Sequence, residues 1–108
     1  MRELMASVLA AQSEEYSRAK DKFGPTHSSD HESYAVLKEE IEEASEELTF
    51  ILRSLDRFWK HVRDNETAHC KKRELADLKR QATLLACEAI QVAAMAHKSI
   101  LTLEAAKE

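Results

Sequence analysis

The residues from Tyr34 to Val62, YAVLKEEIEEASEELTFILRSLDRFWKHV, decide the fold of this chain. Apolar side chains recur there at alternating steps of three and four residues, the spacing that gathers them on one face of an α-helix. The series continues without a miss through Tyr34, Leu37, Ile41, Ala44, Leu48, Ile51, Leu55, Phe58 and Val62. Such regularity favours packing against an antiparallel helix at a small crossing angle.

A shorter helix is expected before this stretch. Apolar residues recur at helical spacing from Met5 and end at Gly24-Pro25. Glycine can adopt the left-handed conformation that closes a helix, and proline cannot donate the next backbone hydrogen bond. Ser29 and Glu32 have the spacing of a capping box, so the central helix is predicted to begin at Ser29.

A second long helix is expected after the central one. The segment from Arg63 to Thr67 has no apolar residue and contains capping residues, which favours a connection there; one helix running through is the alternative. The apolar series then resumes at the same spacing in Leu75, Leu78, Ala82, Leu85, Ala89, Val92 and Ala96.

Composition supports an all-α fold. The 108 residues contain one Gly and one Pro, too few for the tight turns of a sheet protein of this size. We predict a single domain over residues 1–108, an antiparallel helical bundle with two long helices and a shorter N-terminal helix. Because three helices bury only a modest core, we expect self-association into a homodimer or homotetramer to complete a four-helix core.

Several classes of function are disfavoured. A single glycine excludes glycine-rich phosphate loops and dinucleotide folds. A net charge of -4 disfavours binding to nucleic-acid polymers. The longest uncharged apolar stretch, Ala89 to Ala96, is shorter than the roughly 20 residues of a membrane span, and the first residues do not resemble a signal peptide, so we expect no membrane partner and a cytoplasmic location.

The cysteines fit a reducing compartment. Cys70 and Cys87 lie roughly 25 Å apart if they share one helix, so they cannot pair within it. His69 and Cys70 lack a second pair at ligand spacing, which favours an ordinary helix-surface pair over a metal site.

One stretch of the central helix is unusually acidic. Glutamates placed three or four residues apart on a helix repel one another, and only Lys38 offsets them locally. A solvated helix face is the ordinary interpretation of such a stretch, but this repulsion favours a bound cation. The glutamates are Glu39, Glu40, Glu42, Glu43, Glu46 and Glu47.

The two long helices carry matching polar pairs beside their apolar faces. Glu40 and Glu43 occupy the same heptad positions on the central helix as Glu88 and Gln91 on the last one. Antiparallel packing would bring three carboxylates and one amide oxygen together. Oxygen ligands of this kind suit Mg²⁺.

The sequence resembles the MazG-like all-α nucleoside triphosphate pyrophosphohydrolases, particularly their small phage and bacterial members. The family signature is Glu-Glu-x-x-Glu on one helix and Glu-x-x-Asp on the next; here Gln91 stands in place of the Asp. The resemblance covers roughly residues 16–103. The stretches that carry it are Phe23-Gly24-Pro25, His27-Ser28-Ser29, His31 to Leu37, Glu39 to Glu43, and Glu88 to Ala96.

The resemblance implies hydrolysis of a nucleoside triphosphate to the monophosphate and pyrophosphate. Mg²⁺, or Mn²⁺, would be held by Glu40, Glu43 and Glu88, with Gln91 as a weaker amide ligand. Glu39 would act as general base and Lys98 would contact phosphate. Aromatic side chains for the base would come from Tyr16, Phe23 or Tyr34, all of which also suit helix packing.

A second hypothesis is a non-enzymatic helical oligomerisation or interaction module that has lost the full metal site. It predicts that the four polar residues face bulk water, whereas the enzyme hypothesis predicts that they converge.

Overall fold

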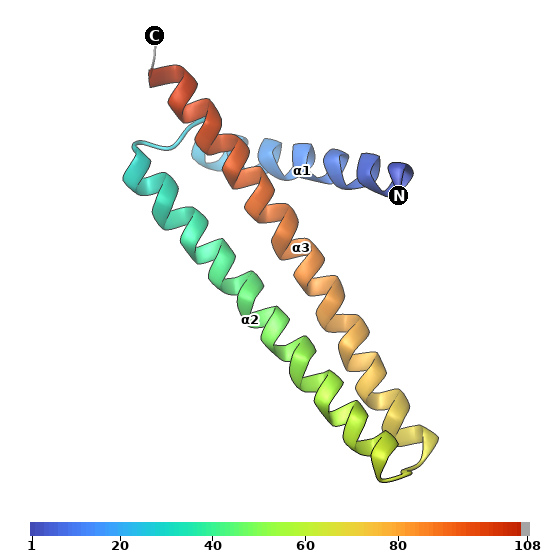
Figure 1. Ribbon diagram of the computed structural model, residues 1–108. Coiled ribbons are helices and arrows are strands. Elements are labelled where there is room, and N and C mark those ends of the chain that lie inside the picture. Colours follow the sequence, from blue (N-terminus) through green and yellow to red (C-terminus); the bar gives the residue numbers. More distant parts are fainter. Residues whose placement is uncertain (107–108) are drawn as a thin grey trace. The chain divides into compact units, whose positions relative to one another are not determined.

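The computed structural model describes residues 1–106 and contains three α-helices, with no strand in that range (Figure 1). Helix α1 spans Arg2–Phe23, α2 spans Asp30–Arg63 and α3 spans Ala68–Ala106. The all-α helical bundle predicted from the sequence, with two long helices and a shorter N-terminal one, is confirmed.

The helices form two compact units. The first combines Met1–Ile41 with the C-terminal segment from Glu88 onward, and the second is Glu42–Cys87. The first unit therefore contains all of α1, the start of α2 and the C-terminal part of α3. The second is a helical hairpin made of the remaining parts of α2 and α3.

Residues just before α2 cap its N-terminus. The Ser29 hydroxyl accepts a hydrogen bond from the Glu32 backbone N–H at 3.1 Å, as predicted. The Glu32 carboxylate, however, accepts its backbone bond from the Ser28 N–H at 3.4 Å instead of from Ser29. The return bond of the capping box is thus displaced by one residue.

The predicted connection between the long helices is confirmed, because α2 ends at Arg63 and α3 begins at Ala68. Asn65 has a positive φ of 51°, and the Glu66 backbone N–H donates to the His61 carbonyl at 2.9 Å. Left-handed backbone is tolerated by asparagine, so this residue allows the chain to reverse within four residues.

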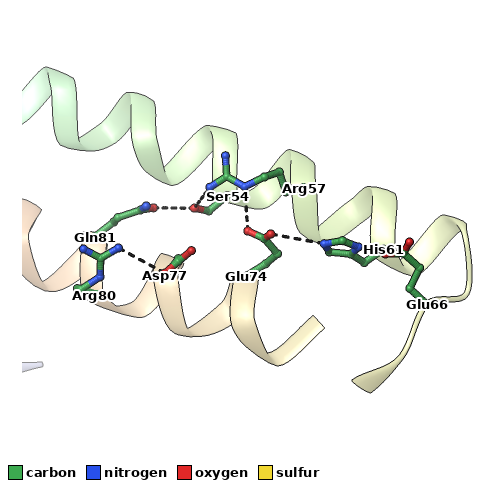
Figure 2. A network of polar contacts seen from close by, with 8 residues as sticks. All are labelled: Ser54, Arg57, His61, Glu66, Glu74, Asp77, Arg80 and Gln81. Carbon is green, nitrogen blue, oxygen red and sulfur yellow. Dashed lines mark hydrogen bonds and ion pairs between the residues drawn. The ribbon is translucent and has the colours of Figure 1, made fainter. Parts of the chain in front are cut away.

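Polar side chains hold the second unit together (Figure 2). Ser54 of α2 is fully buried, and its hydroxyl donates to the Gln81 amide oxygen of α3 at 2.8 Å. The Arg57 guanidinium donates to Ser54 Oγ at 3.0 Å and to Glu74 Oε2 at 2.9 Å. The buried side chains of this unit, Ser54, Glu74 and Gln81, are therefore all polar.

The apolar series expected to form the core is covered only in part. Ile51 and Phe58 of this series are half-buried, but Leu48, Leu55 and Val62 of the same series are exposed. In the second unit the face of α2 that meets α3 is centred on the polar residues Ser54 and Arg57, so part of the apolar series lies outside that contact. We call the exposed apolar row of α2 in the second unit the α2 stripe; it consists of Leu48, Leu52, Leu55, Trp59 and Val62.

Helix α3 also bears on the membrane question. Judged only by its length and by the hydropathy of one 18-residue segment, this helix is long and apolar enough to cross a membrane. A packed helix of a bundle passes the same test, so this property is weak evidence for a membrane span.

Gly24 closes α1 with a backbone conformation that other residues avoid. Its φ is 91° and its ψ is 168°. Because this region is almost restricted to glycine, Gly24→Ala is expected to lower the free energy of unfolding by about 1–3 kcal/mol. Urea denaturation followed by circular dichroism would measure it.

The matched control is Asn65→Gly at the other positive φ, where glycine relieves strain and no comparable loss is expected. Equal stability of Gly24→Ala and the parent protein would show that residue 24 does not need this conformation.

Candidate functional site

A cleft of about 530 Å³ opens in the first unit. Its volume lies within the range of about 300–1,000 Å³ typical of small-molecule sites. All three helices and the connection between α1 and α2 contribute to its lining: Glu15, Ala19, Phe23, His27, Glu32, Val36, Glu39, Glu40, Gln91, Met95 and Lys98.

Two of the predicted metal ligands meet in this unit. Glu40 and Glu88 are half-buried and come from different helices, and their carboxylate oxygens lie within 4.8 Å of each other. Two oxygens on opposite sides of one Mg²⁺ lie about 4.2 Å apart, given Mg–O distances near 2.1 Å. Two carboxylates this close together are able to share one divalent cation. The helix-flank argument from the sequence correctly placed these two residues together.

The other predicted site residues lie as follows. Gln91 is half-buried and Glu39 is exposed, and both line the same cleft as Glu40. Glu43 is exposed and belongs to the second unit, where it follows Glu40 by three residues on continuous helix α2. That spacing puts Glu40 and Glu43 on the same helix face.

Lys98 supplies positive charge to the cleft. Its side chain is buried, with 4% of the residue exposed, and its Nζ lies 6.0 Å from the centre of the Phe23 ring. A buried ammonium that lines a cleft is suited to contact an anion that enters from solution.

His27 is a cleft residue that the sequence analysis did not select. Its backbone N–H donates to Thr102 Oγ1 at 2.9 Å, and its Nδ1 lies 3.4 Å from Glu32 Oε1. Its Nε2 is buried and has no hydrogen-bond partner among the described residues. Burial of this loop histidine depends on Thr102, which is 75 residues away, so local sequence carried no signal for it.

One carboxyl group of the cleft is held in its charged form. The Ser28 hydroxyl, and to a lesser extent the Ser28 backbone N–H, donates to Glu32 and lowers the pKa of that carboxyl below its usual 4.5. His27 adds a smaller contribution in the same direction. Glu32 is thus kept anionic beside His27.

Of the three aromatic residues considered for a base pocket, Phe23 lines the cleft. The Tyr16 hydroxyl donates to the Pro25 carbonyl at 3.0 Å, and its ring packs edge-on against His97 at 4.8 Å. Tyr34 is 68% exposed. Phe23 is therefore the aromatic side chain best placed to contact a ligand.

Comparisons with protein-family models, with curated proteins and with solved structures find no match for this chain.

The Ser28–Glu32 contact predicts a pH-dependent effect. Ser28→Ala should raise the pKa of Glu32 towards 4.5, because the largest stabilisation of the carboxylate is lost. NMR titration of the glutamate side-chain carboxyl resonances would measure this shift. Ser13→Ala is the matched control, since that hydroxyl donates only to the Leu9 carbonyl of its own helix.

The sign of the stability effect follows from the lowered pKa. The contribution of Glu32 is fully present above its usual pKa and is lost as pH falls through the lowered folded-state value. The stability difference between the parent protein and Ser28→Ala should therefore shrink on acidification below about pH 4.5. A difference that grows in acid would contradict this assignment.

Proposed function

We propose that the chain is a Mg²⁺-dependent nucleoside triphosphate pyrophosphohydrolase, which converts a nucleoside triphosphate to the monophosphate and pyrophosphate. The observation that carries the proposal is one cleft that contains both Glu40, paired with Glu88, and the buried ammonium of Lys98. A metal–triphosphate complex needs carboxylates for its cation and a protein cation for its phosphates. The resemblance to the MazG-like family supports the same reaction.

The acidic pair would hold the metal, with Glu43 on the same face of α2 and the Gln91 amide oxygen as further ligands. Mn²⁺ accepts the same oxygen donors. When bound, the ion neutralises phosphate charge and lowers the pKa of a coordinated water. Three carboxylates and an amide leave room for substrate phosphates in the coordination sphere.

The remaining cleft residues have distinct roles in this proposal. Glu39 is exposed beside Glu40 and orients the attacking water as general base. Lys98 contacts the phosphate chain, and Phe23 offers a ring face to the base. Water adds across the bond between the α- and β-phosphates, so that pyrophosphate leaves.

Release of pyrophosphate from a panel of nucleoside triphosphates with Mg²⁺ or Mn²⁺ tests this function. Glu40→Gln and Glu88→Gln should each lower the rate by more than about tenfold, because each removes a charged ligand. Glu14→Gln, an exposed glutamate on α1, is the matched control. No release from any nucleotide, or equal rates in the three variants, would overturn the proposal.

Gln91→Asp is a gain-of-function test of the same site. An aspartate restores one negative charge at the position where the family has Asp, so tighter Mg²⁺ binding is expected. The measurement is the Mg²⁺ concentration that gives half-maximal pyrophosphate release. An unchanged concentration would show that residue 91 does not reach the ion.

A separate observation favours self-association, and we propose that the partner is a second copy of this chain. The α2 stripe repeats at steps of four and three residues, which is the spacing of a helix-pairing face. Its N-terminal flank carries Glu42, Glu43, Glu46 and Glu47, whereas its C-terminal flank carries Arg53, Lys60 and Arg63 against Asp56. An antiparallel second α2 would place acidic flanks opposite basic ones.

This pairing would complete the four-helix core expected from the sequence, as a homodimer or within a homotetramer. The same stripe is the feature that favours the alternative function, a non-enzymatic oligomerisation or interaction module. The two functions differ in pyrophosphate release and not in oligomeric state. For either function we propose a cytoplasmic protein without a membrane or nucleic-acid partner.

Leu55→Glu tests the stripe, since a charge at its centre would have to be buried in the paired state. We expect dissociation to smaller species, measured by sedimentation velocity. Leu84→Glu, at an exposed leucine of α3 outside the stripe, is the matched control and should keep the parent mass. A monomeric parent protein, or equal masses for both variants, would contradict this interface.

A further inference from the structure

Three different donor atoms gather at the end of the second unit where α2 meets α3. His61 lies in the last turn of α2, Glu66 in the connection and Cys70 in the first turn of α3. One ligand atom from each lies within 4.8 Å of the other two, and His61 Nδ1 is in contact with a Glu66 carboxylate oxygen. His61 and Cys70 are half-buried.

A second observation concerns the other nitrogen of the same histidine. His61 Nε2 lies 3.4 Å from Glu74 Oε1, and Glu74 is buried (Figure 2). The second oxygen of Glu74 accepts a hydrogen bond from Arg57 Nε at 2.9 Å. A buried carboxylate behind the imidazole is the arrangement that fixes the tautomer and orientation of metal-binding histidines.

We propose that His61, Glu66 and Cys70 form a binding site for Zn²⁺. Zn²⁺ prefers a tetrahedral set of thiolate, imidazole and carboxylate ligands, whereas Mg²⁺ and Ca²⁺ prefer oxygen alone. Nδ1 of His61, a Glu66 oxygen and Cys70 Sγ supply three positions, and water supplies the fourth. The proposed pyrophosphohydrolase does not use this site, which lies wholly within the second unit.

The proposed ion would act as a clamp on the hairpin. Its three ligands come from the end of one helix, the four-residue connection and the start of the next helix, so binding ties these segments together. Since the assembled ligand set exists only in the folded unit, Zn²⁺ stabilises that unit in proportion to its occupancy.

An ordinary His61–Glu66 ion pair is the competing interpretation of the contact. It requires a protonated imidazole and makes no use of Cys70. Metal binding requires a neutral imidazole and the Cys70 thiolate. The thiol therefore distinguishes the two.

Titration of the reduced, metal-free full chain with Co²⁺ is the first test, because a cobalt–thiolate bond produces charge-transfer absorption. We expect one Co²⁺ per chain with this absorption, displaced by Zn²⁺. Cys70→Ser should abolish the absorption, and Cys87→Ser, at the exposed cysteine of the same helix, should keep it. No absorption in the parent protein, or its loss in Cys87→Ser alone, would overturn the proposal.

A matched pair of histidine variants tests the nitrogen ligand. His61→Gln should weaken Co²⁺ binding at least about tenfold, while His69→Gln, beside Cys70 but exposed, should not. Equal effects would contradict the assignment. Glu40→Gln should leave Co²⁺–thiolate absorption unchanged, so this result is independent of pyrophosphate release.

Cysteine alkylation tests the proposed Zn²⁺ site in the parent protein, without any substitution. Saturating Zn²⁺ should slow iodoacetamide modification of Cys70 by about tenfold or more without slowing Cys87, because a metal-bound thiolate is a poor nucleophile. Peptide mass spectrometry would measure both sites. Equal rates at Cys70 with and without Zn²⁺ would overturn the proposal.

Discussion

Hydrogen bonds that involve the buried side chains of Ser54, Glu74 and Gln81 are the constraint on which the second unit depends. Ser54 joins Gln81, and Arg57 joins both Ser54 and Glu74 across the α2–α3 hairpin. A shift of one helix along the other would leave these groups buried without partners, and each such loss costs about 1–3 kcal/mol. Apolar contacts would tolerate the shift better, since they are not directional. The polar network therefore determines the register of the hairpin.

The same network explains the outward position of the apolar residues. A helix has limited circumference, and the face of α2 that meets α3 in the second unit is occupied by Ser54, Arg57 and His61. The stripe around Leu55 and Trp59 consequently lies on another face and is exposed. An exposed apolar surface of this regularity is typical of a protein–protein interface. The polar contact between α2 and α3 therefore accounts both for the buried polar groups within the chain and for the exposed apolar row that we propose pairs with a second chain.

The sequence predicted the features that depend on local signals. The helix limits followed from Gly24-Pro25, from the Ser29 cap and from the lack of apolar residues after Arg63, all of which act over a few residues. The proximity of Glu40 and Glu88 followed from helical periodicity in two antiparallel helices. Periodicity shows which face of a helix is apolar, but it does not show what covers that face. For this reason the burial of Ser54 and the exposure of Leu55 were both missed.

The two proposed metal sites differ in how far they could be anticipated and in their chemistry. As a metal ligand, Cys70 has only His69 as a neighbour in the sequence, whereas its spatial partners His61 and Glu66 depend on how the chain turns at Asn65. Their sulfur and nitrogen donors favour Zn²⁺, and the oxygen donors of the cleft favour Mg²⁺, so each ion has a preferred site. The hairpin ion would also act on the polar network, because His61 contacts Glu74, and Glu74 accepts the Arg57 hydrogen bond. Occupancy of the proposed Zn²⁺ site would thereby strengthen the contacts that fix the hairpin register.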